Sequence, residues 1–198
     1  MLGAMSPDRL HPTGASTRPQ GITLIELMVT LAILAILLAI AVPSMQQLIA
    51  RKRVAGVASE LASDIRYLRS MGVQTATLVQ IDFGASAAAT CYALSTDPFG
   101  LGQPCDCNNP SSCDGSSGAP KIVKTVTVPI AGGITLSVGN NPTNTVFSGP
   151  NSLPLNGATI TATVSSGQGG SVKVQTNATG RPYACSISGQ ESNFPVCS

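Results

Sequence analysis

A long apolar segment near the N-terminus carries a single carboxylate close to its start. Residues 21–44 read GITLIELMVTLAILAILLAIAVPS, and Glu26 is their one charged residue. Residues 27–50 carry no charge, and about 20 apolar residues in a helix cross the hydrocarbon core of a bilayer. Ionisable groups in such spans are rare and usually have a partner or a function. The segment therefore predicts a membrane-spanning helix in which Glu26 has a role.

The residues before this segment are polar and rich in proline, and they contain Arg9 and Arg18. A secretory signal peptide would instead place a shorter apolar region ahead of its small-residue cleavage site. Basic residues ahead of the span indicate that this end begins in the cytoplasm. An ordinary single-pass anchor is the alternative interpretation, but it gives no reason for Gly21 and Glu26 to stand at this spacing.

The run from Gly21 to Glu26 resembles the N-terminal signal of type IV pilins and pseudopilins, with Ile22 where phenylalanine is commonest. The resemblance implies that a prepilin peptidase cuts after Gly21 and removes residues 1–21 as a leader. It also implies N-methylation of Ile22, the new N-terminal residue. Glu26 would then pair with the terminal amine of a neighbouring subunit in a filament, where low dielectric strengthens the attraction.

The helical pattern continues well beyond the apolar segment, and we expect one helix from about Thr23 to Met71. Pro43 lies inside it and predicts a kink, because proline lacks the N–H that the helix needs. Residues 22–50 would form the transmembrane or filament-core part. Residues 51–71 would continue as an amphipathic helix, with apolar residues predicted on one face: Leu48, Ala55, Ala58, Leu61, Ile65 and Leu68.

From residue 72 onward the chain is rich in Ser, Thr, Asn, Gly and Val, and its apolar residues alternate as in β-strands. A glycine-rich hairpin turn is expected at 165–170 and a long loop at 96–120. The predicted fold class is α+β, with the long helix packed on an antiparallel β-rich, pilin-like domain at 72–198. The expected strands are 78–83, 90–95, 121–128, 134–138, 145–148, 158–164, 171–177 and 183–187.

All six cysteines follow the apolar segment, at Cys91, Cys105, Cys107, Cys113, Cys185 and Cys197. An even number in a domain outside the cytoplasm indicates disulfides, and six cysteines allow 15 pairings. We favour a bond between Cys185 and Cys197, with the other four pinning the long loop. A zinc site at Cys105, Cys107 and Cys113 is disfavoured, because the single histidine, His11, lies in the leader. No metal or other cofactor is expected.

The β-rich part is close to neutral, and it lacks the basic field that nucleic-acid binding usually needs. From residue 72 it carries four cations, Lys121, Lys124, Lys173 and Arg181, against five anions, Asp82, Asp97, Asp106, Asp114 and Glu191. The sequence shows no Ser-His-Asp set, no glycine-rich phosphate loop and no paired carboxylates, so we do not expect an enzyme.

The helix end at 53–70 and the run at 178–181 resemble the GspH/FimT group of minor pseudopilins and minor pilins. The resemblance implies an inner-membrane protein with its C-terminal domain in the periplasm, extracted into a pseudopilus or pilus. Its partners would be other pilins or pseudopilins, the prepilin peptidase and the inner-membrane assembly platform. Some members bind DNA through Gly-Arg-x-Arg; here Gly180 and Arg181 match but Tyr183 replaces the second arginine.

Two functions remain open at this point. The first is a structural subunit, a GspH-like minor pseudopilin of type II secretion. The second is a FimT-like minor pilin of a type IV pilus that acts in pilus assembly, DNA uptake or the binding of a surface partner. Arg181 is the one residue that indicates a DNA contact, and a surface arginine after a turn is the simpler interpretation.

Overall fold

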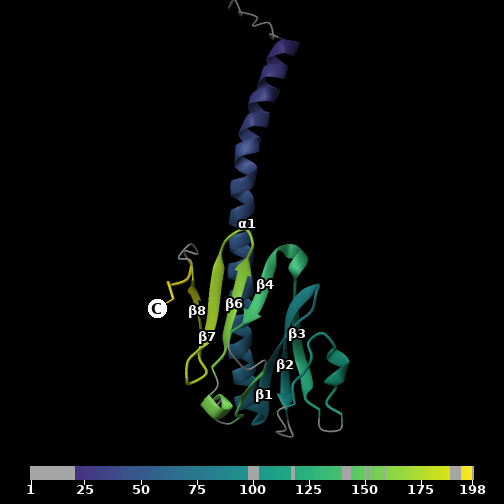
Figure 1. Cartoon of the computed structure of the whole chain (residues 1–198), viewed down its shortest axis with the longest axis vertical. Helices are drawn as coiled ribbons and strands as arrows, with labels where there is room; N and C mark the ends of the chain where they lie inside the picture. The colour runs from purple at the N-terminus through teal and green to yellow at the C-terminus, as the bar shows by residue number, and fades with distance from the viewer. Residues whose placement is uncertain are drawn as a thin grey trace, which may run out of the picture. The chain divides into compact units, whose positions relative to one another are not determined.

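The structure is a computed structural model that describes residues 21–97, 103–116, 119–139, 144–149, 151, 153–157, 159–187 and 193–197. The leader up to residue 20, part of the predicted long loop, and Glu191 lie outside the described residues. The chain divides into two compact units, Met1–Ala41 and Val42–Ser198. The first contains the beginning of helix α1, and the second contains the rest of α1 and all the β-strands (Figure 1).

Helix α1 spans Leu24–Thr75 and runs without interruption through Pro43. At its start the hydroxyl of Thr23 accepts a hydrogen bond from the Glu26 N–H at 3.3 Å, so Thr23 acts as the N-cap. At its end Ala76 has a φ of 51°, and this left-handed residue stops the helix just before the first strand. The single long helix is therefore confirmed, four residues longer at its C-terminal end than predicted.

Eight strands form two antiparallel sheets in the second unit (Figure 1). One sheet has the order β3-β2-β1-β5 and the other the order β4-β6-β7-β8. The short 3₁₀ helices are η1 (Pro110–Ser112), η2 (Ile130–Gly132) and η3 (Leu155–Gly157). The α+β class with antiparallel sheets is confirmed. The strands are β1 (Leu78–Ala85), β2 (Ala89–Asp97), β3 (Lys121–Pro129), β4 (Ile134–Val138), β5 (Asn144–Phe147), β6 (Thr161–Ser166), β7 (Ser171–Thr176) and β8 (Pro182–Ser186).

Each predicted strand exists, with ends shifted by three residues or fewer. The predicted glycine-rich turn joins β6 to β7, where Gly169 and Gly170 have φ values of 102° and 96°. Side chains other than glycine strongly disfavour such angles, which explains why glycine occupies both positions.

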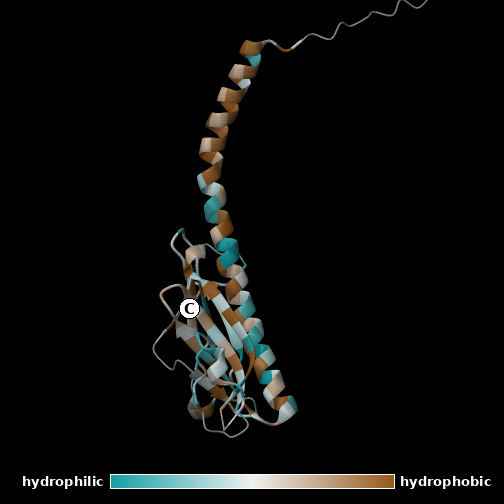
Figure 2. Ribbon diagram, turned by 90° about the vertical axis from the view of Figure 1, so that its right-hand side faces the viewer, coloured by the Kyte–Doolittle hydropathy of each residue, from teal (hydrophilic) through white to brown (hydrophobic). Residues whose placement is uncertain are grey.

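The hydrophobic core lies between α1 and the two sheets. Val54, Ala58, Leu61, Ile65 and Leu68 of α1 are fully buried. Full burial of each large aliphatic side chain contributes about 1.5–3 kcal/mol. The sheets contribute Val79, Ile81, Tyr92, Leu94, Phe147, Val164, Val172 and Val174 to the same cluster. In Figure 2, α1 changes from almost wholly hydrophobic to mixed colours along the part that packs against the sheets.

The predicted apolar face of α1 was wrong at its beginning. Leu48 is 51% exposed and Ala55 is only half-buried, whereas Ala50 and Val54 are buried. Counting back from Ala58 in steps of four residues leads to Val54 and Ala50, so the buried stripe passes beside the two residues that were predicted.

A polar network fixes α1 against the first sheet. Asp64 of α1 is buried, and its carboxylate accepts a hydrogen bond from the Tyr92 hydroxyl at 2.8 Å. Lys124 of β3 donates to both oxygens of the same carboxylate, at 2.7 and 2.9 Å, and to Glu60 Oε1 at 3.0 Å. A buried carboxylate is tolerated only with such partners, so the network specifies how α1 sits on β2 and β3.

Candidate functional site

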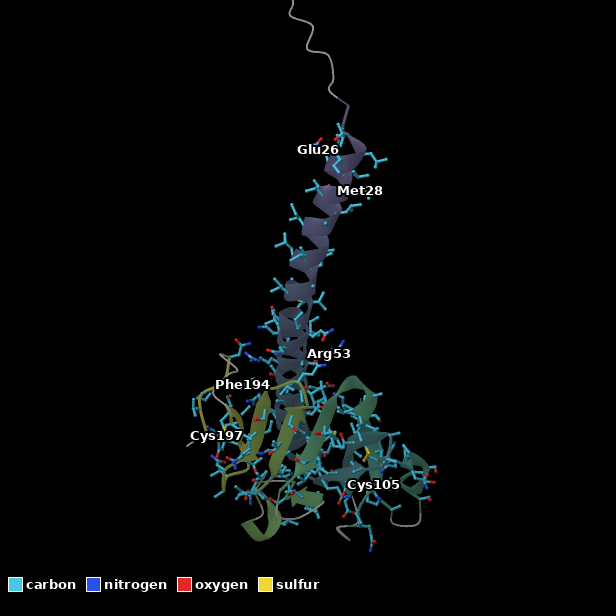
Figure 3. All side chains as sticks on the ribbon, turned by 45° about the horizontal axis from the view of Figure 1, so that its top comes forward. Glu26, Met28, Arg53, Cys105, Phe194 and Cys197 are labelled. Atoms are coloured by element: carbon cyan, nitrogen blue, oxygen red, sulfur yellow. A yellow bond between two sulfur atoms is a disulfide. The ribbon has the colours of Figure 1, made fainter. Side chains whose placement is uncertain are left out.

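The predicted processing motif lies at the start of α1. Gly21, Ile22 and Thr23 precede the helix, and the Ile22 side chain is exposed. Glu26 is exposed in the first turn, where Figure 3 labels it, and the positive end of the helix dipole favours its negative charge. Gly21 and Ile22 therefore sit in an accessible, non-helical stretch, as a peptidase would require.

The first unit exposes a continuous apolar helical surface. Among the described residues, α1 is the one helix long and apolar enough to span a membrane, and its most hydrophobic window lies near the N-terminus. None of that window is buried within the chain, so these residues do not belong to a soluble core. Apolar surface of this extent is of the kind that a lipid bilayer or another apolar helix covers.

Pro43 lies inside α1 and leaves one carbonyl of the preceding turn without its usual N–H partner. The helix nevertheless continues on both sides of it. The predicted kink stays a prediction.

All six cysteines are paired: Cys91 with Cys107, Cys105 with Cys113, and Cys185 with Cys197. The Cα atoms of the three pairs lie 5.9, 5.8 and 5.0 Å apart, in the usual range for disulfides. The last pair is the one that the sequence favoured.

The first two bonds hold the described part of the long loop, at 103–116, on the outer face of the first sheet. Cys91, Cys105, Cys107 and Cys113 form a small buried cluster with Ala93, and Figure 3 labels Cys105. A Cβ atom on Gly84 would lie 2.7 Å from the Cys107 sulfur, so glycine is needed where the loop meets β1. Sequence analysis gave no sign of this role for Gly84.

A buried carboxyl lies beneath the disulfide-bonded loop at 103–116. Asp82 of β1 is 1% exposed and receives a hydrogen bond from the Gln80 amide at 3.1 Å. The same amide nitrogen donates to the carbonyl of Gln103 in the loop at 2.6 Å. Burial raises the pKa of Asp82 to about 7, only partly offset by hydrogen bonds from the Cys105 backbone and Gln80. Ionisation of Asp82 would place a negative charge in this buried position beneath the loop.

Arg181 is exposed and lies beside two arginines of α1. Arg69 donates to the Thr179 carbonyl at 3.0 Å, and Arg66 to the Pro182 carbonyl at 3.4 Å. Partial burial, followed by repulsion from Arg181, lowers the pKa of Arg69. We call Arg66, Arg69 and Arg181 the arginine cluster. The sequence indicated only Arg181 as a candidate residue here. Arg66 and Arg69 could not be linked to it, because they lie more than 100 positions earlier in the chain.

Tyr183, which stands in place of the second arginine of the DNA-binding pattern, is exposed on β8. Its hydroxyl donates to Gln175 Oε1 at 3.0 Å. Together with Arg66 and Phe194 it lines a small groove of about 300 Å³ between α1 and β8. An exposed aromatic ring beside a cation offers a surface on which a base or another ring can stack.

The described residues contain no group of three or more His, Cys, Asp or Glu side chains that could hold a metal ion. Cys105, Cys107 and Cys113, which would have formed the zinc site that the sequence disfavoured, are all in disulfides. Their sulfurs are therefore not available as thiolate ligands in this structure.

An accessible Gly-Ile-Thr-Leu-Ile-Glu motif, an exposed apolar helix and two antiparallel sheets packed on the second part of that helix define a type IV pilin-like protein. The prokaryotic N-terminal methylation motif matches residues 17–42, and the type II transport protein GspH matches residues 57–180. The second match covers more than half of the chain, so the chain belongs to the GspH family. It is a minor pilin or pseudopilin, a structural subunit that assembles with other pilins.

Two crystal structures of the type IV minor pilin FimU from Pseudomonas aeruginosa PAO1 are similar to this chain. The first is 14% identical, with a TM-score of 0.48, and covers 67% of this chain and 87% of FimU. The second is 14% identical, with a TM-score of 0.46, and covers 66% and 90%. No curated protein sequence matches this chain.

Proposed function

We propose that this chain is a GspH-like minor pseudopilin of type II protein secretion. The match to the type II transport protein GspH over residues 57–180 is the observation that carries the proposal. That region contains most of the buried face of α1, from Ala58 onward, and seven of the eight strands completely, so the likeness extends through the packed domain.

The proposed mechanism is mechanical. The prepilin peptidase cuts between Gly21 and Ile22 and frees the amine of Ile22, which is then methylated. The subunit waits in the inner membrane, held by residues 22–50, with 51–71 continuing the helix and 72–198 folded in the periplasm. The assembly platform extracts it into a pseudopilus, where Glu26 pairs with the terminal amine of a neighbouring subunit. That pairing offsets the cost of a carboxylate in an apolar environment.

Deletion of the gene in its own host tests this proposal. Loss of type II secretion substrates from the culture medium, restored by the wild-type chain, is the expected result. Normal secretion combined with loss of surface pili would contradict it. Mass spectrometry of filaments sheared from the cell surface provides a second readout, since a short pseudopilus leaves the processed chain in the inner membrane.

The second candidate is a FimT-like minor pilin that contributes to pilus assembly or DNA uptake. The arginine cluster favours it, because three cations and the Tyr183 ring lie on one flank of a domain that is otherwise close to neutral. Each neutralised phosphate makes the affinity for DNA fall more steeply with salt. Salt-dependent binding of duplex DNA by the processed chain, lost in Arg181→Ala, would support this candidate.

A further inference from the structure

Three consecutive cations stand on α1 directly after its uncharged segment. Arg51, Lys52 and Arg53 follow the run at 27–50, which contains no charged residue. Lys52 and Arg53 are exposed, and Arg51 is half-buried. Figure 3 places Arg53 at the end of the domain where α1 leaves the sheets. We call these three residues the basic collar.

The described part of the domain does not neutralise the basic collar. None of its three members forms an ion pair with a described carboxylate, and the Arg51 Nε is buried without a hydrogen-bond partner among those residues. Glu60, the next acid along α1, is bonded to Lys124. Neighbouring cations repel one another, so three of them in a row favour the binding of an anionic partner.

The basic collar spreads around the helix at one level. Successive residues of an α-helix are turned by about 100° and rise by about 1.5 Å, so three in a row cover about 200° of the circumference within about 3 Å of height. A peptide in a groove or a DNA duplex would lie along one side of the helix and would leave part of the collar without an anion. A layer of anions through which the helix passes meets all three cations together.

The position of the basic collar along the chain matches the depth of lipid phosphate groups. At about 1.5 Å per residue, the uncharged run at 27–50 is about 36 Å long. The hydrocarbon core of a bilayer is about 30 Å thick, and the headgroup regions bring the total to about 40–45 Å. A helix whose uncharged run fills the hydrocarbon core therefore carries residues 51–53 into the headgroup layer. Met45, Leu48 and Ile49 are exposed, so the uncovered apolar surface reaches almost to the collar.

We propose that the basic collar binds the phosphate groups of anionic phospholipids in the leaflet that faces the β-rich domain. The inference rests on the membrane-anchored subunit of the proposed function, and it adds a class of ligand and the residues that recognise it. Cations at an anionic bilayer surface attract its headgroups over about a Debye length. Bound headgroups fix the depth at which the subunit waits in the membrane, and they must be released when the subunit is extracted.

Native mass spectrometry of the full chain tests the proposal. The chain is purified from the membranes of its own host in detergent micelles that contain equal amounts of phosphatidylglycerol and phosphatidylcholine, and the lipids retained on it are counted. The wild-type chain should retain several-fold more phosphatidylglycerol than phosphatidylcholine, with a ratio that falls as ionic strength rises. Lys52→Gln combined with Arg53→Gln should bring the ratio close to one. Arg53→Lys keeps the charge and should retain most of the preference.

Lys121→Gln is the matched control for Lys52→Gln, because it removes the same charge from another exposed lysine. Lys121 begins β3, and Pro129 at the other end of that strand lines the same pocket as Arg53. At about 3.3 Å per strand residue, Lys121 therefore stands about 26 Å from that end of β3. Lys52→Gln should lower the ratio of the two lipids, whereas Lys121→Gln should leave it unchanged.

Equal retention of the two lipids by the wild-type chain, an unchanged ratio in the double variant, or equal losses from Lys52→Gln and Lys121→Gln would overturn the proposal. The fold should survive these changes, because the substituted side chains are exposed, and an unchanged Tm of the purified full chain checks this. A negative lipid result would leave the filament role intact. Normal secretion after deletion of the gene would contradict the secretion role and would leave the lipid ratio as it is.

Discussion

Removal of the Lys124 ammonium should destabilise the domain mainly through Asp64 and only slightly through Glu60. The Asp64 side chain is 10% exposed and the Glu60 side chain is 46% exposed, while Lys124 itself is 38% exposed. Breaking a fully buried pair costs about 3–5 kcal/mol, and exposed pairs contribute about 0–1 kcal/mol. Water reaches Lys124, so we expect Lys124→Met to cost about 2–3 kcal/mol and Glu60→Gln less than about 1 kcal/mol.

A double-mutant cycle separates the two contributions. Thermal unfolding of the full chain in detergent micelles, with the disulfides intact, should show Lys124→Met lowering Tm by about 4–12 °C, at about 2–4 °C per kcal/mol for a domain of this size. The coupling between Lys124→Met and Asp64→Asn should exceed about 1 kcal/mol, and the coupling with Glu60→Gln should be near the limit of detection.

The pKa of Lys124 adds a check on pH. Its hydrogen bond with Asp64, followed by the one with Glu60, raises the pKa above its usual range despite slight desolvation. The stabilisation that the charged ammonium contributes is therefore fully present at neutral pH and is lost as pH rises through that elevated pKa. Equal couplings for the two carboxylates, or an Asp64 coupling abolished by 1 M salt, would refute the account of a partly buried network.

Three further outcomes are expected. Asp82→Asn should raise the free energy of unfolding by about 2–4 kcal/mol at pH 8 and have little effect near pH 4. The reason is that the raised pKa of Asp82 makes the stability of the wild-type chain fall as pH rises from about 4 through 7. A variant that is less stable than the wild-type chain at pH 8 would contradict this. Arg181→Ala, measured against Lys173→Ala by DNA titration at physiological salt, should change binding little if the chain is a pseudopilin, and a large loss specific to Arg181 would favour DNA uptake instead. Glu26→Ala should still insert into the membrane but no longer co-isolate with other pilins, and undiminished co-isolation would exclude the proposed pairing.

The elements of the fold could be predicted from the sequence because their patterns are local. The apolar run and the alternation of small polar and β-branched residues each depend on a few neighbouring positions. The pairing of β5 with β1 could not be predicted, because β2, the disulfide-bonded loop, β3 and β4 lie between these two strands in the sequence. The division into two sheets was missed for the same reason.

The candidate sites divide in the same way. Gly21, Ile22 and Glu26 could be recognised because the motif is contiguous. The arginine cluster could not be recognised, because it joins α1 to residues more than a hundred positions away in the chain. The network around Asp64 could not be recognised either, because it joins α1 to a strand residue 60 positions away. Asp64 in particular has the sequence context of a solvated helical acid, and only the position of Tyr92 and Lys124 beneath it shows that it is buried.

The intact mass of the mature chain purified from host membranes tests the central claim most directly, because the proposed assembly begins with processing at Gly21. The account predicts a chain that begins at Ile22 and carries one methyl group on its terminal amine, and a Gly21→Ala chain that keeps its leader. A wild-type chain that retains residues 1–21, or is cut at another position, would contradict it.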